Sequence, residues 1–260
     1  MEFLQGGRAN QIARAGNMIH RPAGAWSKAV HALLDYLQTA GFLAAPRAWG
    51  FDDNGNEILT FLEGEVCNYP LSEAAASLAA LESSANLLRA YHDATVTFLQ
   101  THPAGQTWMF PARSPAEVIC HGDFAPYNVV LDGDQAIGLI DFDTAHPGPR
   151  AWDLAYALYR WGPLSNAPDL DSFGDLDNRI ARARRFCEVY GLAPADRAVL
   201  VDGVIARLQA LADHIVTEAA QGNQAFQANM ADGHHLLYLA DKAYIQANRV
   251  PIAHGLVHDR

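Results

Sequence analysis

Two short apolar runs joined by a tight turn are the feature that most constrains how this chain can fold. Residues 128–131 (NVVL) and 136–140 (AIGLI) flank the turn Asp132-Gly133-Asp134, a pattern that predicts a β-hairpin. Because a hairpin brings its outer ends together, we expect the polar side chains at both ends to lie close to one another. Carboxylate and amide oxygens gathered in this way are the ligands that Mg²⁺ prefers. These polar side chains are His121, Asp123 and Asn128 before the hairpin and Asp141 and Asp143 after it.

The chain before this hairpin is predicted to be rich in strands. Residues 14–21 read as a turn and a short strand, and a helix follows with Ser27 as its N-cap. Residues 48–51 and 57–62 are two further extended runs. They flank Asn54-Gly55, a strong hairpin signal because both residues accept a positive φ.

Beyond Gly64 the sequence is mainly helical, because apolar residues recur there at helical spacing. The helical patterns cover residues 72–100, 152–161, 178–190, 195–220 and 232–247. We therefore expect an α+β fold of two lobes. A small, strand-rich N-terminal lobe with one helix would span residues 1–64, and a larger, mainly helical C-terminal lobe would span residues 65–260.

The composition is that of an ordinary globular protein. Half of the 260 residues are apolar, enough for a substantial core. The chain has no apolar run long enough for a membrane span, and its first residues lack the pattern of a signal peptide, so we expect a cytoplasmic location. The widely spaced Cys67, Cys120 and Cys187 predict reduced, mostly buried thiols. Nothing in the sequence indicates an oligomeric state.

The chain is acidic, with a formal net charge of -11 from 18 basic and 29 acidic residues. Such a charge disfavours nucleic acid and anionic membranes as partners. It also raises the local concentration of cationic ligands, although solubility alone is the simpler explanation.

The polar groups around the central hairpin resemble a known set of motifs. His121-Gly-Asp123, Asn128 and Ile140-Asp141-Phe142-Asp143 are similar in order and spacing to the catalytic and metal motifs of aminoglycoside phosphotransferases and choline kinases, relatives of protein kinases. The likeness extends over the whole chain. It implies a bilobal protein-kinase-like fold and a phosphotransferase with ATP or GTP as co-substrate. The acceptor would be a hydroxyl group of a small molecule, with aminoglycosides and choline as cationic candidates.

The resemblance also implies a role for each motif residue. Asp123 would be the catalytic base, and Asn128 and Asp141 would bind Mg²⁺. His121 would be a structural residue of the catalytic loop. Asp153, in Trp152-Asp153-Leu154, would open a helix and tie down the backbone of that loop. Asp143 is either a metal or supporting ligand or a simple turn residue.

The N-terminal lobe departs from the family pattern. Where a lysine usually reaches the phosphates and pairs with a helix glutamate, this chain has Arg21, and residues 27–39 contain no glutamate. His31 lies near the position of the missing glutamate. The contact between the protein and the nucleotide phosphates is therefore either built differently or weak. Gly6 and Gly7 would form a loop over the phosphates or a plain turn, and Glu63 would lie at an adenine-binding hinge.

An aspartate-rich segment of the helical lobe is the candidate acceptor site. In the resembling enzymes, inserted segments of the helical lobe often shape an acidic acceptor site, and residues 164–178 of this chain are rich in aspartate. Asp169, Asp171 and Asp175 would bind a cationic acceptor, or they would simply keep a surface loop solvated.

Two other functions remain open from the sequence. The Arg21 departure is compatible with a catalytically weak, kinase-like protein that only binds nucleotide. A metal-dependent hydrolase would instead use His121, Asp123, Asp141 and Asp143 as ligands and would need further ligands elsewhere.

Overall fold

The structure is a computed structural model that describes residues 2–3, 12–102, 105–166 and 173–258. The chain divides into two compact units, residues 1–153 and 154–260. The lobe boundary predicted at Gly64 lies inside the first unit and stays a prediction.

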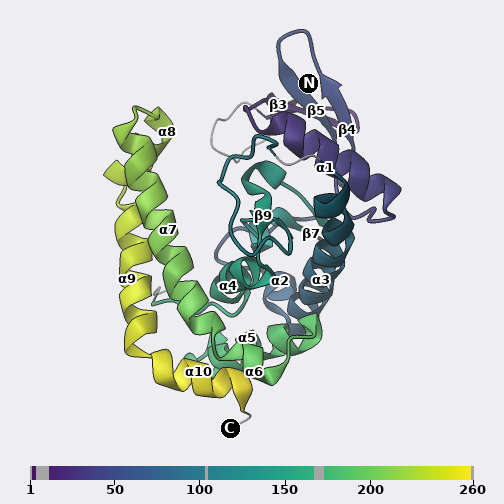
Figure 1. Ribbon diagram of the computed structural model, residues 1–260. Coiled ribbons are helices and arrows are strands. Elements are labelled where there is room, and N and C mark those ends of the chain that lie inside the picture. Colours follow the sequence, from purple (N-terminus) through teal and green to yellow (C-terminus); the bar gives the residue numbers. More distant parts are fainter. Residues whose placement is uncertain (1, 4–11, 103–104, 167–172, 259–260) are drawn as a thin grey trace. The chain divides into compact units, whose positions relative to one another are not determined.

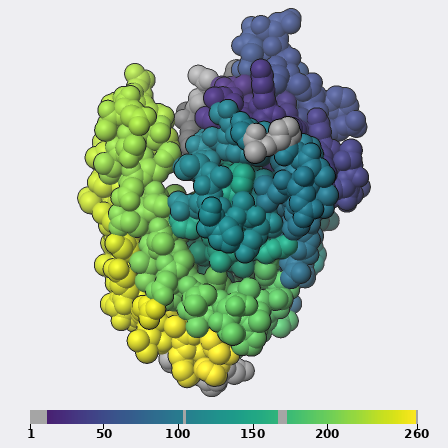
Figure 2. All heavy atoms as spheres, viewed as in Figure 1, coloured from purple at the N-terminus to yellow at the C-terminus, as the bar shows by residue number. Residues whose placement is uncertain are grey.

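A five-stranded antiparallel sheet begins the first unit (Figure 1). Its spatial order is β1-β2-β3-β5-β4, and strand β3 pairs with β5 so that Arg21 lies directly opposite Glu57. The β4–β5 hairpin lies at the outer edge of this unit, with Asn54 and Gly55 exposed (Figure 2). The strands are β1 (Glu2–Phe3), β2 (Ala13–Ala15), β3 (Met18–Pro22), β4 (Ala48–Phe51) and β5 (Asn56–Thr60).

Helix α1 (Ser27–Thr39) packs its apolar face inward through Val30, Leu33, Leu34 and Leu37. The prediction of Ser27 as N-cap was wrong. The cap position belongs to Trp26, which makes no side-chain cap, and Ser27 Oγ instead accepts a hydrogen bond from the Gly24 backbone N–H at 3.0 Å. The hydroxyl therefore stabilises the turn that precedes the helix.

The predicted central hairpin is present as β7 (Val129–Asp132) and β8 (Gln135–Leu139). A second short pair, β6 (Val118–Cys120) with β9 (His146–Gly148), lies on either side of it in sequence. Two 3-10 turns, η1 (Pro126–Asn128) and η2 (Phe142–Thr144), link these strands. Helices α2 (Glu73–Ala76) and α3 (Leu78–Thr101) precede them, and α3 packs on β6 and β8.

Helix α4 (Arg150–Trp161) begins in the first unit and continues into the helical second unit. In the second unit α7 and α9 run side by side (Figure 1), and buried Tyr156, Trp161 and Phe186 contribute to its core. Its other helices are α5 (Leu176–Tyr190), α6 (Pro194–Arg197), α7 (Leu200–Ala220), α8 (Gln224–Ala231), α9 (His234–Ala247) and α10 (Arg249–Val257).

The sheet followed by helices confirms the predicted α+β class. None of the helices in the described part of the chain combines the length and apolarity that a membrane span requires. The three cysteines carry free thiols, and Cys120 and Cys187 are buried as predicted.

Candidate active site

A sharp loop between β6 and η1 carries the His121-Gly122-Asp123 motif. Gly122 has φ 82°, and a Cβ atom there would lie 2.4 Å from the backbone oxygen of Thr144. Only glycine fits such a conformation and such a close approach. The Thr144 hydroxyl donates to the backbone oxygen of His121 at 2.9 Å, so the loop is held against the segment that follows β8.

Two side chains hold the Asp123 carboxylate. The Tyr127 hydroxyl donates to Oδ1 at 2.8 Å, and Asn128 Nδ2 donates to Oδ2 at 3.0 Å. A carboxylate oxygen has two lone pairs, so each oxygen can still accept a further hydrogen bond. Asp123 is therefore oriented and able to take a proton from a neighbouring hydroxyl group. Sequence reasoning did not identify Tyr127, although it lies within the motif.

His121 is a fixed, neutral spacer. Its Nε2 donates to the Ile140 backbone oxygen at 2.9 Å, so the imidazole carries its proton there, and Nδ1 accepts from the Asp123 N–H at 3.3 Å. With both ring nitrogens engaged and the residue fully buried, His121 has no nitrogen for a metal ion. This arrangement disfavours the metal-dependent hydrolase.

Asp153, in the first turn of α4, binds the catalytic loop. Its carboxylate accepts from the backbone N–H groups of His121 and Gly122 at 2.6 and 2.8 Å and from His92 Nε2 at 3.0 Å. Burial alone would raise the pKa of Asp153, but the hydrogen bond and charge of His92 outweigh it and lower the pKa to about 2.

Asp141 has the one positive φ found at a non-glycine residue in the described ranges, with φ 62° and ψ 64°. Such backbone strain gathers at functional sites, where it aims a side chain. The preceding residue, Ile140, donates its N–H to the Asn128 backbone oxygen at 2.9 Å. The two predicted metal ligands, Asn128 and Asp141, are thus brought to the same end of the hairpin.

Arg21 of β3 reaches this end of the hairpin. Its Nη1 donates to Asp141 Oδ1 at 2.9 Å and its Nη2 to Asp143 Oδ1 at 2.6 Å. The third donor, Nε, bonds to Glu57 Oε1 at 2.6 Å. Arg21 therefore joins the sheet to both acidic residues that follow β8.

Glu57 of β5 was not predicted as a site residue. It is 1% exposed, and its Oε2 accepts from His31 Nε2 of α1 at 2.9 Å. Arg21 thus pairs with a carboxylate of the neighbouring strand, and His31 of α1 contacts the same carboxylate. A signal was present in the sequence, because Glu57 lies two residues before Leu59 and therefore on the same face of the strand. Only the strand register reveals that Glu57 lies opposite Arg21.

The cluster around Arg21 carries excess negative charge. Burial alone would lower the pKa of Arg21, but Asp143, Asp141 and Glu57 outweigh it and raise that pKa above its ordinary value. The pKa of Asp143 is also raised, because burial and its acidic neighbours outweigh the attraction of Arg21. Three carboxylates around one guanidinium favour the approach of a further cation.

The donor set fits Mg²⁺. Asn128 donates through its amide nitrogen to both Asp123 O and Asp123 Oδ2, which leaves its amide oxygen to ligate a cation beside the Asp141 carboxylate. Within the described ranges no three His, Cys, Asp or Glu side chains are arranged to hold a metal ion. The fit therefore depends on an amide oxygen and on carboxylates, as oxygen-binding cations prefer.

Two further predicted site residues, Glu63 and Asp175, are not part of this cluster. Glu63 pairs with Arg14 at the surface of the sheet. Asp175 is the N-cap of α5, where Oδ1 accepts from the Asn178 N–H at 3.0 Å. Gly6, Gly7, Asp169 and Asp171 lie outside the described residues.

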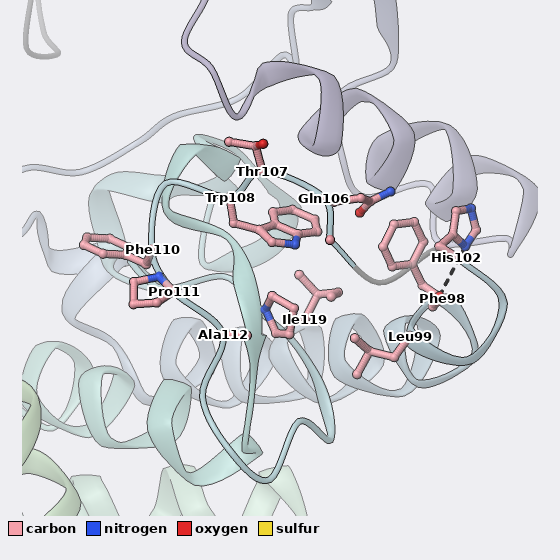
Figure 3. A pocket seen from close by; sticks show the side chains of 12 residues that line it. Phe98, Leu99, His102, Gln106, Thr107, Trp108, Phe110, Pro111, Ala112 and Ile119 are labelled. Carbon is pink, nitrogen blue, oxygen red and sulfur yellow. Dashed lines mark hydrogen bonds between the residues drawn. The ribbon is translucent and has the colours of Figure 1, made fainter.

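An aromatic cavity of about 550 Å³ lies in the first unit (Figure 3). Phe98, Trp108 and Phe110 line it, and the His102 ring stacks on Phe98 with centroids 3.9 Å apart. None of the predicted catalytic or metal-binding residues is part of the lining. The cavity is therefore lined by a different set of residues from the candidate catalytic cluster.

Comparison with known proteins gives the family. The sequence profile of the phosphotransferase enzyme family matches residues 99–190. The trifolitoxin immunity protein of Rhizobium leguminosarum bv. trifolii is 33% identical over 211 residues, which are 78% of this chain and 78% of that protein.

Solved structures with a similar fold include two small-molecule kinases. A choline/ethanolamine kinase family protein from Mesorhizobium loti has a TM-score of 0.60 at 15% identity, covering 94% of this chain and 88% of that one. A spectinomycin phosphotransferase, solved with ADP and spectinomycin, has a TM-score of 0.53 at 14% identity, covering 98% and 92%. Identities this low show the fold alone. Together with the sequence matches, they show that this chain belongs to the phosphotransferase enzyme family and has the kinase-like fold of aminoglycoside phosphotransferases and choline kinases.

Proposed function

We propose that this protein transfers the γ-phosphate of a nucleotide, ATP or GTP, to a hydroxyl group of a small molecule. The observation that carries the proposal is the held carboxylate of Asp123, fixed by Tyr127 and Asn128 at the end of the hairpin that also presents Asp141. Phosphoryl transfer needs positioning and charge compensation more than covalent chemistry, and these residues supply both. We retain the predicted cytoplasmic location as part of this proposal.

Each residue has a distinct task in the proposed reaction. Asp123 accepts the hydroxyl proton of the acceptor and so orients the attacking oxygen. Asn128 and Asp141 would hold Mg²⁺, which would supply charge compensation for the phosphates. Before nucleotide binds, Asp143 supports this end of the hairpin through Arg21. Asp153 and His121 keep the catalytic loop in shape.

The acceptor is proposed to be a small molecule that is toxic to the cell. Support comes from the relative that is an immunity protein, since its similarity covers most of both chains. The net charge of -11 favours a cationic acceptor, as in an amino sugar or an amino alcohol.

A second candidate is a catalytically weak nucleotide-binding protein. The contacts of Arg21 with Asp141 and Asp143 favour it, because they occupy carboxylate oxygens near the proposed metal site.

The two candidates differ in nucleotide consumption. We expect wild-type protein with Mg²⁺ to consume ATP or GTP when the right member of a panel of aminoglycosides, amino alcohols and other hydroxyl compounds is added. We expect Asp123→Asn to abolish consumption while nucleotide still binds. Binding of nucleotide without consumption for any acceptor, and with unchanged affinity in Asp123→Ala, would favour the second candidate.

A further inference from the structure

The Arg21 guanidinium uses its two sides differently. Its Nε bonds inward to Glu57, whereas its terminal nitrogens Nη1 and Nη2 bond outward to Asp141 and Asp143. The guanidinium is planar and rigid, so a partner that fixes Nε also fixes the direction of the terminal pair. The inward contact thus determines where the two outward donors point.

The inward contact, between Arg21 Nε and the Glu57 carboxylate, is rigid. Glu57 is 1% exposed and lies directly opposite Arg21 in the β3–β5 register. Its second oxygen is held by His31 Nε2 at 2.9 Å, and the His31 ring stacks on Phe51 with centroids 4.6 Å apart. A buried carboxylate with both oxygens bonded has little freedom to turn.

The outward contacts are made to more accessible groups. The Asp141 side chain is 45% exposed and that of Asp143 is 28% exposed, against 1% for Glu57. Although Arg21 itself is only 12% exposed, ion pairs that water can reach exchange partners at a smaller cost than fully buried ones. The terminal nitrogens of Arg21 are therefore the end of this network that can change partner.

Building on the proposed function, we infer that Glu57, fixed by His31, is the positioning residue that directs the terminal nitrogens of Arg21 onto the phosphates of the nucleotide. Nε remains on Glu57 while Nη1 and Nη2 move from the two aspartates to phosphate oxygens, a bidentate contact that suits a guanidinium. A guanidinium can keep the inward contact through Nε while its two terminal nitrogens make a forked outward contact. Arg21 of β3, Glu57 of β5 and His31 of α1 therefore act together as one phosphate-binding unit.

The test is the affinity for ATP and for adenosine, measured by calorimetry in EDTA so that no metal contributes. Removing the charge of Glu57 makes the site less negative, so simple electrostatics predicts that Glu57→Gln binds ATP more tightly. The positioning role predicts the opposite, a loss of about tenfold or more in ATP affinity, since a charge-assisted hydrogen bond is lost. Adenosine, which has no phosphate, should bind equally to both proteins.

A double-mutant cycle identifies the partner of Glu57. In the Arg21→Gln background, Glu57→Gln should cause no further loss of ATP affinity. An equal loss in that background, or an unchanged or increased ATP affinity of folded Glu57→Gln, would overturn the inference.

A second pair of variants covers the case in which Glu57→Gln fails to fold. His31→Gln keeps a donor near the position of Nε2 and should retain ATP affinity, whereas His31→Leu removes the donor and should lower it about tenfold. Equal ATP affinity in the two variants would overturn the inference. Absence of ATP binding by the wild-type protein both in EDTA and with Mg²⁺ would instead overturn the proposed function, which separates the two failures.

Discussion

At the scale of single residues, the site depends on how side chains of ordinary chemistry are held. Asp123 is a carboxylate fixed by two neighbours, and His121 is a neutral imidazole with both nitrogens engaged. Arg21 has three partners, one buried and two accessible. In each case the hydrogen-bond partners determine the role that a residue can take in phosphoryl transfer.

Tyr127→Phe tests the holding of Asp123. The variant loses the hydroxyl group that donates to Asp123 Oδ1, and we expect kcat to fall about fivefold because one orienting hydrogen bond contributes about 1 kcal/mol. The KM for nucleotide should not change. Steady-state kinetics measure both values.

Tyr36→Phe is the matched control, because Tyr36 lies on α1 and contacts Phe98 and His102 through its ring. Equal kcat values for Tyr127→Phe and the wild type would show that the tyrosine does not orient Asp123.

At the scale of elements, the β7–β8 hairpin and the start of α4 assemble the site. The hairpin brings Asn128 and Asp141 to one end, and α4 contributes Asp153, which binds the loop after β6. The hairpin was predictable because a tight turn between two apolar runs is a local signal. The role of Asp153 could be proposed only through family resemblance, since it depends on contacts distant in sequence.

Acid stability tests the contact between α4 and the catalytic loop. The pKa of Asp153 is about 2 in the folded protein, against an ordinary 3.8, so the ionised group contributes about 2 kcal/mol to the free energy of unfolding. A lowered folded pKa gives stability that is present above pH ~4 and is lost as the pH falls towards ~2. Denaturant unfolding at a series of pH values measures this loss.

Asp153→Asn should lower stability at neutral pH and flatten the decline between pH ~4 and ~2. Asp134→Asn, in the exposed turn of the hairpin, serves as the control and should keep the wild-type decline. An unchanged decline in Asp153→Asn would contradict the assigned role.

The elements that sequence reasoning missed have physical causes. Helix α10 was missed because Pro251 looks like a helix stop, yet it occupies the first turn, where the lack of an N–H costs little. The partner of Arg21 was missed because the β3–β5 register is a long-range property. Local patterns show which residues can be strand or helix, whereas pairing across strands decides which charges meet.

At the scale of the whole molecule, the net charge of -11 acts against the nucleotide and in favour of a cationic acceptor. An anionic nucleotide therefore needs local positive groups, and Arg21 is one such group at the site. The fold was predictable at this scale because the order of strands, central hairpin and helices is visible in the sequence. The acceptor was not, because its recognition depends on side chains brought together only by folding.

Salt dependence tests the effect of the net charge. For a cationic acceptor, we expect KM to rise roughly a few-fold between low and high salt, because screening weakens long-range attraction. An uncharged acceptor should show no such rise and serves as the control. A KM for the cationic acceptor that does not change with salt would show that the acidic surface has no part in acceptor binding.

The most direct test of the central claim is a crystal structure with Mg²⁺ and a non-hydrolysable nucleotide, since it does not require the acceptor to be known. We predict that the metal ion contacts Asn128 Oδ1 and the Asp141 carboxylate, that the γ-phosphate faces Asp123, and that Arg21 Nε remains on Glu57. A nucleotide bound elsewhere, or a metal ion that contacts neither Asn128 nor Asp141, would contradict the account.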